Sequence, residues 1–238
     1  MKYLYLVWSN LKRRKMRTIL TLLSIMVAFL LFGYLGAIRQ AFNQGVDVAG
    51  ADRLIVRHKV SIIQLLTESY EGRMEQLPGV ENATHQTWFG GIYQEPKNFF
   101  AQMPVEHEEF FDFYPEYIIS DEQMEAFKST RSGAIAGRGI ADRFDWEVGD
   151  RIPINATAWF KRDGGRTWEF DLVGIYDGEE KGTDTSLFFF RYDFFEETRN
   201  PGASGLVGWY VVKVKDPALK SLPAALMLLM SLGIVFLA

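Results

Sequence analysis

The longest apolar run of the chain lies close to its N-terminus. No charged residue occurs from Thr18 to Ile38, and Arg39 closes the run. As a helix rising about 1.5 Å per residue, this segment would span roughly 31 Å, close to the ~30 Å hydrocarbon core of a bilayer. A cleavable export signal has a shorter apolar core, about 7–15 residues, and ends at a small-residue cleavage site. The following residues, AIRQAFNQGVD, match such a site poorly, so we expect residues 18–38 to form an uncleaved transmembrane helix.

A cluster of positive charge stands directly before this run, and it bears on orientation. The cluster consists of five basic residues: Lys12, Arg13, Arg14, Lys15 and Arg17. No acidic residue occurs before Asp47. Positive charge beside a membrane helix favours the cytoplasmic side, so the N-terminus is expected in the cytoplasm and the following residues outside it. A buried core helix, the alternative for the apolar run, would not usually carry such charges.

The residues before the span also have a helical apolar pattern. Leu4, Val7, Trp8 and Leu11 follow i, i+3, i+4, i+7 spacing, with polar residues between them. We interpret residues 1–17 as a basic, amphipathic cytoplasmic lead that lies on the membrane surface. The alternative is that these residues are only the start of the membrane helix.

A second apolar run, Ser221 to Ala238, closes the sequence and contains no charge. Its 18 residues are at the short end for a membrane span. We expect residues 219–238 to form a second, shorter hydrophobic helix, which spans the membrane at most in part. Because the sequence stops inside this run, we expect a chain cut short.

Between the two apolar runs, residues 39–218 alternate between helical and strand-like patterns. RIPINATAWF and RTWEFDLVGIY are strand-like, and Asp163-Gly164 between them is a turn signal, which predicts a β-hairpin. Leu66, Tyr70, Met74 and Leu77 predict one helix face, and Ser120 with Gln123 predicts a capping box that opens another helix. SLFFFRYDFFEETRN predicts a strand followed by a helix, and GWYVVKVKD a last strand. We therefore expect an α+β domain outside the cytoplasm.

The charge and the missing motifs of the chain argue against several classes of function. Six of the 26 basic residues precede the span, which leaves 20 against all 30 acidic residues and a net charge of about −10. Such an acidic domain argues against nucleic-acid binding. The chain has no cysteine nucleophile, and it has no nucleotide-binding P-loop and no G-x-S-x-G motif. His58, His85 and His107 lack metal-ligand spacing. We expect no enzymatic activity, no cofactor and no metal.

One aromatic segment, Phe99 to Tyr117, has two interpretations. Its rings lie among acidic residues and prolines, a composition that suits a partner surface. Aromatic rings equally fill the core of a small domain. The candidate partner-surface residues are Phe110, Phe111, Phe113 and Tyr114.

Four stretches in series resemble one family. NLKRRKMRTILTLL, EQLPGVENAT, RSGAIAGRGIADRFDWEVGDRIPI and FDLVGIYDG resemble, in the right order, motifs of the FtsX-like and MacB-like permease subunits of ABC transporters. The resemblance covers residues 2 to about 216. It implies a MacB-like periplasmic core domain after the first helix, in a bacterial inner-membrane protein.

The resemblance also implies partners and a mechanism. Such subunits work with a separate ABC ATPase, as homo- or heterodimers in the lipid bilayer, and pass its motion to the outer domain during export. The family continues with three more helices, whereas one apolar run follows the domain here, so we expect a truncated permease or the front portion of one. The alternative function is a membrane-anchored binding or sensor module with no transport of its own.

Overall fold

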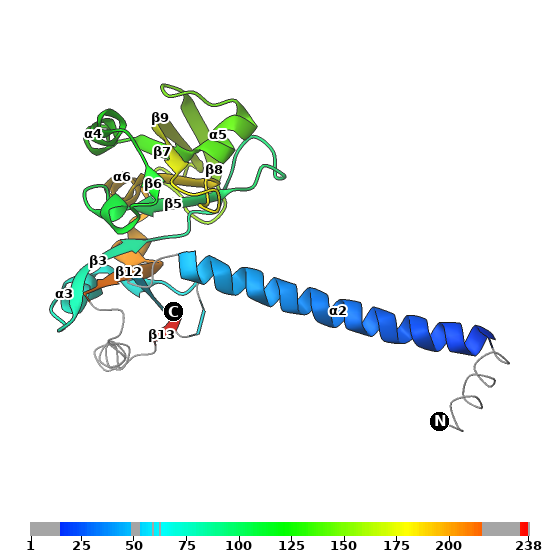
Figure 1. Cartoon of the computed structure of the whole chain (residues 1–238). Coiled ribbons are helices and arrows are strands. Elements are labelled where there is room, and N and C mark those ends of the chain that lie inside the picture. Colours follow the sequence, from blue (N-terminus) through cyan, green and yellow to red (C-terminus); the bar gives the residue numbers. More distant parts are fainter. Residues whose placement is uncertain (1–14, 49–52, 59, 62, 216–233, 238) are drawn as a thin grey trace. The chain divides into compact units, whose positions relative to one another are not determined.

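The computed structural model describes residues 15–48, 53–58, 60, 61, 63–215 and 234–237. The chain divides into two compact units, residues 1–49 and residues 50–238. The first unit contributes one long helix, α2 (Lys15–Val48), and the second is the outer domain. Figure 1 shows both units with their elements labelled.

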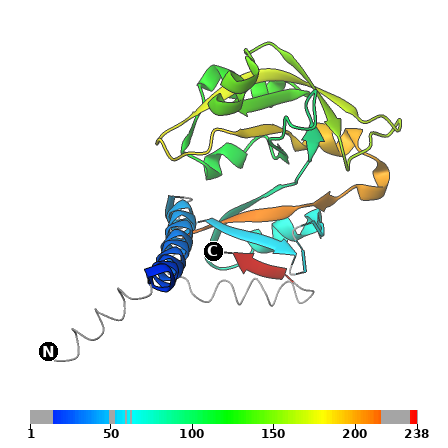
Figure 2. The same cartoon turned by 90° about the vertical axis from the view of Figure 1, so that its right-hand side faces the viewer.

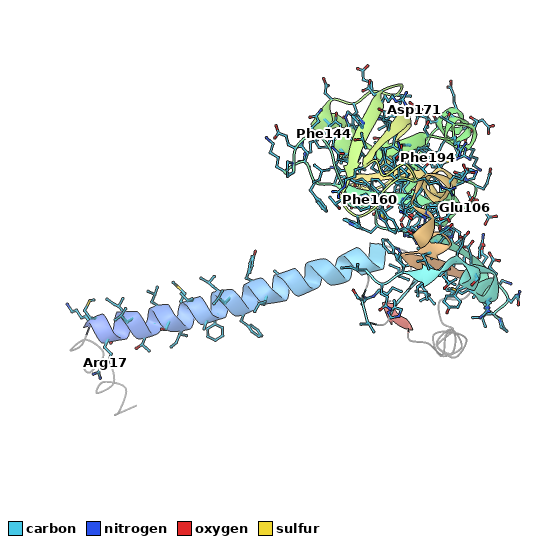
Figure 3. All side chains as sticks on the ribbon, turned by 180° about the vertical axis from the view of Figure 1, so that it is seen from behind. Arg17, Glu106, Phe144, Phe160, Asp171 and Phe194 are labelled. Carbon is cyan, nitrogen blue, oxygen red and sulfur yellow. The ribbon has the colours of Figure 1, made fainter. Side chains whose placement is uncertain are left out.

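Helix α2 has the surface expected of a membrane helix. Residues Lys15–Ala37 have a mean hydropathy of 2.3 and, by length and composition, are long and apolar enough to cross a bilayer. The apolar side chains of this stretch are exposed on every side of the helix (Figure 3). A helix covers the whole predicted span of 18–38 and exceeds it at both ends, from Lys15 to Val48. Of the predicted lead, residues 1–17, the last three belong to α2, and residues 1–14 lie outside the described residues.

The outer domain is built on a mixed sheet. Its hydrogen-bonded strand order is β13-β1-β12-β3-β5-β10-β7-β9-β8-β4, and β6 pairs with β9 beside this path. β10 runs parallel to β5 and β7 runs parallel to β9, and the other pairs are antiparallel. The strands are β1 (Arg53–His58), β3 (Val80–Gln86), β4 (Gly91–Ile92), β5 (Ala101–Val105), β6 (Tyr117–Ile118), β7 (Gly133–Gly137), β8 (Arg151–Ala156), β9 (Thr167–Gly178), β10 (Leu187–Arg191), β12 (Trp209–Val214) and β13 (Ile234–Leu237).

The sheet divides into two lobes, which Figure 2 shows one above the other. The small lobe comprises β13, β1, β12 and β3, with η1 (Glu68–Tyr70) and α3 (Glu71–Glu75) beside β3. The large lobe comprises the strands from β5 to β4. One residue pair, Gln86 with Val105, joins the ladders of the two lobes. A separate two-stranded sheet pairs β2 (Leu66–Thr67) with β11 (Leu206–Val207).

Side chains of the large lobe alternate between two faces, and each face is buried. On β10, Phe188 and Phe190 belong to one hydrophobic cluster and Phe189 to another. This follows from the two-residue period of a strand. The first cluster includes Ile140 of α5 and the second Phe127 of α4, so helices contribute to both. The remaining helical elements are η2 (Phe110–Phe113), α4 (Asp121–Ser129), α5 (Arg138–Phe144), α6 (Tyr192–Thr198) and η3 (Pro201–Ala203). The predicted mixture of helices and strands is confirmed.

The predicted hairpin is confirmed as β8 and β9. The two strands pair antiparallel, with Asn155 opposite Thr167. Gly164 has φ +82°, and its N–H donates to the carbonyl of Lys161 at 3.0 Å. That backbone conformation is inexpensive only for glycine. The hairpin tip is also attached to the rest of the domain, because Lys161 pairs with Arg199 in an antiparallel β-bridge.

Two predicted helices form with differences. Leu66 belongs to β2, so the helical stretch that buries Met74 is shorter than its apolar spacing suggested. Ser120 caps α4 as predicted, because its Oγ accepts from the N–H of Gln123 at 3.3 Å. The Gln123 side chain, however, does not complete the capping box. Its Oε1 accepts from the N–H of Ile175 in β9 at 3.3 Å, which ties the start of α4 to the sheet.

The C-terminal apolar run differs from expectation where the structure describes it. Residues Ile234–Leu237 form strand β13, paired antiparallel with β1, and not a helix. A short apolar run suits a buried helix or a strand equally well, and here an available strand edge selects the strand. The other residues of the predicted hydrophobic helix, 219–233 and 238, lie outside the described residues.

Candidate functional site

The first residue of the outer domain's first strand contacts both lobes. Arg53 opens β1, and four residues separate it from Val48, where α2 ends. Its side chain is 7% exposed and reaches from the small lobe to the large-lobe segment around η2. A buried arginine is rare unless it is paired, so its partners define a structural junction.

Three contacts hold the Arg53 guanidinium. Its Nη1 donates to the carbonyl of Phe113 at 2.9 Å and to the carboxylate of Glu116 at 2.8 Å. Its Cζ lies 4.6 Å from the centre of the Tyr114 ring, in cation–π geometry. We call this group of four residues the Arg53 junction. It fastens the chain segment nearest α2 to the core of the large lobe.

Aromatic rings continue from the junction into the core. Tyr114 stacks on Tyr117 with ring centres 5.4 Å apart, and Tyr117 packs on Tyr176 at 4.7 Å. Burial raises the pKa of Tyr114 to about 12, although the charge of Arg53 opposes this. The phenol is therefore neutral at physiological pH and serves in packing and hydrogen bonding. Arg53 therefore contacts a continuous row of packed aromatic side chains. Rows of packed side chains can carry energetic coupling between distant sites of a protein.

A second charged group is buried near the hairpin tip. Arg199 is fully buried and pairs with Glu196, and it also donates to the Tyr192 hydroxyl at 3.1 Å and to the Leu206 carbonyl at 2.9 Å. Burial acts to raise the pKa of Glu196, but hydrogen bonds from Ser204 and the Gly205 N–H, together with the Arg199 charge, outweigh it. The pKa of Glu196 therefore lies below its usual value. This network anchors α6 to the segment that follows it.

The structure places the aromatic candidates in the core. Phe110 and Phe113 are buried, and Phe111 and Tyr114 are partly buried against the cluster that contains Phe189. This arrangement corresponds to the core alternative that the sequence left open, because the two buried rings are not available to a partner. Tyr114 contributes to the Arg53 junction instead.

The basic candidates lie partly outside the described residues. Lys15 and Arg17 are exposed in the first turn of α2, where Figure 3 labels Arg17. Lys12, Arg13 and Arg14 fall among residues 1–14, which the structure does not describe. The structure thus brings Lys15 and Arg17 together on one helix end and leaves the other three untested.

The three histidines lie at separate places. His85 is buried between Glu71, which bonds its Nδ1, and the ring of Tyr192 at 4.3 Å. His107 lies 3.4 Å from a carboxylate oxygen of Glu106, and His58 ends β1. Among the described residues, no group of three or more histidine, cysteine or acidic side chains is arranged to hold a metal ion.

Sequence reasoning did not find Arg53 and Glu116. They are 63 positions apart and belong to no motif, so no local pattern signals their pairing. The one signal in the sequence that could have indicated an ion pair was a basic residue, Arg53, at the start of an acidic domain.

Comparison with known proteins shows which solved structures have a similar fold. No protein-family model and no curated protein sequence matches the chain. The structure is similar to the periplasmic region of MacB from Actinobacillus actinomycetemcomitans, with 13% identity and a TM-score of 0.55 over 79% of this chain and 89% of that one. It is also similar to the extracellular domain of the noncanonic ABC-type transporter YknZ from Gram-positive bacteria. That match has 10% identity and a TM-score of 0.52, over 78% of this chain and all of the other. The resemblance drawn from the sequence motifs is thus confirmed at the level of the fold: the outer domain has the fold of the periplasmic region of MacB.

Proposed function

We propose that the chain is a permease subunit, or the N-terminal portion of one, of an ABC-type export or mechanotransmission system. The observation that carries the proposal is the combination of a MacB-like periplasmic fold with a preceding helix long and apolar enough to span a membrane. Neither feature alone indicates a transporter. The motif order in the sequence supports the same assignment.

In this proposal the chain does not hydrolyse ATP and is not an enzyme. It lies in the bacterial inner membrane with α2 across the bilayer, the N-terminus in the cytoplasm and the α+β domain outside. The five basic residues before the span support this orientation. A separate ABC ATPase supplies the energy, and a second permease subunit, identical or different, completes the transporter.

The chain itself would pass motion from the membrane to the outer domain. Four residues separate α2 from β1, and even fully extended they span no more than about 14 Å. A shift of α2 by a few ångströms would therefore reach Arg53 with little loss. The Arg53 junction would transfer it from the small lobe to the large lobe.

Co-purification tests the assignment. The full-length chain, carrying an affinity tag, is extracted from membranes of its source organism in mild detergent, and the captured proteins are identified by mass spectrometry. We expect a protein with a nucleotide-binding P-loop to co-purify in a fixed ratio. Capture of the intact chain without any ATPase would overturn the proposal and favour the membrane-anchored binding or sensor module.

A further inference from the structure

Three tryptophans from distant parts of the chain line one apolar pocket of the outer domain. Trp88 follows β3, Trp159 lies in the β8–β9 connection and Trp209 opens β12, and Ile63 and Leu65 lie beside them. The pocket has a volume of about 390 Å³. This is within the range of about 300–1,000 Å³ that is usual for small-molecule sites, which are mostly apolar with a few polar groups. We call it the tryptophan pocket.

Hydrogen bonds fix the walls of the tryptophan pocket. Nε1 of Trp159 donates to the carbonyl of Trp88 at 2.9 Å, and Nε1 of Trp168 donates to the carbonyl of Trp159 at 3.2 Å. Gly208, which also lines the pocket, donates its N–H to the hydroxyl of Thr87 at 3.0 Å. These contacts hold the Trp159 indole and the backbone of Trp88, Trp159 and Gly208 in place, so this wall of the pocket needs little ordering when a ligand enters.

An arginine occupies one face of a pocket indole. The guanidinium of Arg199 lies 5.5 Å from the centre of the Trp159 ring. An aromatic ring attracts a cation through its negative face, and here a buried cation already lies against that ring. Because one face of the Trp159 ring is already occupied by this guanidinium, an aromatic cage for a quaternary ammonium is disfavoured.

A second arginine neighbours one wall of the tryptophan pocket. Arg57 is directly opposite Trp209 in the antiparallel pairing of β1 and β12, so the two side chains are neighbours on one face. Its Nε is buried and has no hydrogen-bond partner among the described residues, and no described carboxylate forms an ion pair with it. Four residues earlier, on the same face of β1, Arg53 has Glu116 as its acidic partner. Among the described residues, Arg57 thus has no partner for its charge, and it neighbours an apolar pocket.

We propose that the tryptophan pocket binds an anionic amphiphile. The apolar body lies against the indoles of Trp88, Trp159 and Trp209, and Arg57 binds a single anionic head group. Guanidinium pairs well with planar carboxylates and with phosphates, so either head group fits this chemistry. The inference goes beyond the proposed transport function and does not depend on it, since binding is measured without ATP or a partner.

Octanoate is a suitable probe because its tail is apolar and its head is a carboxylate. The full-length chain in nanodiscs of zwitterionic lipid is titrated with octanoate by isothermal titration calorimetry, and the signal of empty nanodiscs is subtracted. Octyl phosphate, octanol and octylammonium share the tail and differ in the head. We expect saturable binding of one or both anions, weaker binding of octanol and none of octylammonium. Whichever anion binds more tightly identifies the head group.

Two variants separate the head-group contact from the pocket. Arg57→Met should weaken anion binding about tenfold or more, as expected for loss of a charge-assisted hydrogen bond, and leave octanol binding unchanged. Ala158→Trp, at an exposed position that lines the pocket, should block all three binding ligands. Arg151→Met, which removes an exposed arginine of β8, is the matched control and should bind like the wild type. Thermal melts confirm that each variant is folded.

Three results would overturn the proposal. The first is the absence of saturable anion binding to the folded wild type. The second is equal anion affinity in folded Arg57→Met or folded Ala158→Trp. The third is octylammonium binding as tightly as octanoate. If Arg57→Met does not fold, Ala158→Trp decides the question alone.

Discussion

Replacing Arg53 with methionine should destabilise the outer domain more than the loss of any exposed arginine. The change keeps the apolar stem and removes the charge and all the donors. It leaves the Phe113 carbonyl without its side-chain donor, the Glu116 carboxylate without its cation and the Tyr114 ring without its cation–π partner. Each of these three losses can be given a magnitude.

An orphaned buried acceptor costs about 1–3 kcal/mol. Breaking a fully buried ion pair costs about 3–5 kcal/mol, but Glu116 is 22% exposed and can recover part of its hydration, so this range is an upper limit. The cation–π contact contributes about 0.5–2 kcal/mol. Because the three losses share one side chain and are not additive, we expect the free energy of unfolding to fall by about 2–4 kcal/mol.

Urea denaturation of residues 50–238, followed by far-ultraviolet circular dichroism, measures this loss. Arg151→Met is the control, since Arg151 forms an ion pair with Glu169 in which both side chains are more than half exposed. Such surface pairs contribute about 0–1 kcal/mol. A double-mutant cycle with Glu116→Gln isolates the ion pair, with an expected coupling of about 1–2 kcal/mol. If Arg53→Met costs no more than Arg151→Met, the Arg53 junction does not hold the lobes together.

Three further predictions concern the hairpin turn, the Glu196 carboxylate and the orientation in the membrane. Gly164→Val, at φ +82° but in open space, should destabilise the outer domain by about 1 kcal/mol or more through backbone strain alone, and an unchanged melting temperature would refute the turn. Because the pKa of Glu196 is lowered in the folded state, its carboxylate contributes stability above its ordinary pKa, near 4.5, that is lost as the pH falls. Glu196→Gln should therefore flatten the acid limb of a pH-stability curve, and an equally steep limb would contradict this. A reporter active only outside the cytoplasm, fused after Gly50, should be active, and reversing the five basic residues before the span should lower that activity; an inactive wild-type fusion would refute the orientation.

Elements with a local signal were predictable from the sequence. The β8–β9 hairpin follows from alternating strands around an Asp-Gly turn, and β10 followed by α6 from a switch of hydrophobic period. The cap at Ser120 needed one side chain and one nearby N–H. All of these depend on contacts within a few residues, which periodicity and turn chemistry encode.

Pairings between distant segments were not predictable in the same way. Nothing local indicates that β1 lies between β12 and β13, or that Arg53 reaches Glu116. The same limit applies to Gln123, whose side chain prefers a distant strand to its own helix cap, and to the tryptophan pocket, which combines three separate segments. The aromatic segment shows the limit most clearly, since composition alone suits a core and a surface equally.

Hydrogen exchange in the reconstituted complex tests most directly whether α2 moves the outer domain. The full-length chain is assembled with its ATPase, and amide exchange is compared with and without a non-hydrolysable ATP analogue. We predict a nucleotide-dependent change at β1 and η2, the two elements that the Arg53 junction connects. The change should disappear when about ten Gly/Ser residues, enough to make a flexible linker, are inserted between Phe42 and Val48. Unchanged exchange at both elements in a complex that hydrolyses ATP, or an equal change in the insertion variant, would contradict mechanical transmission.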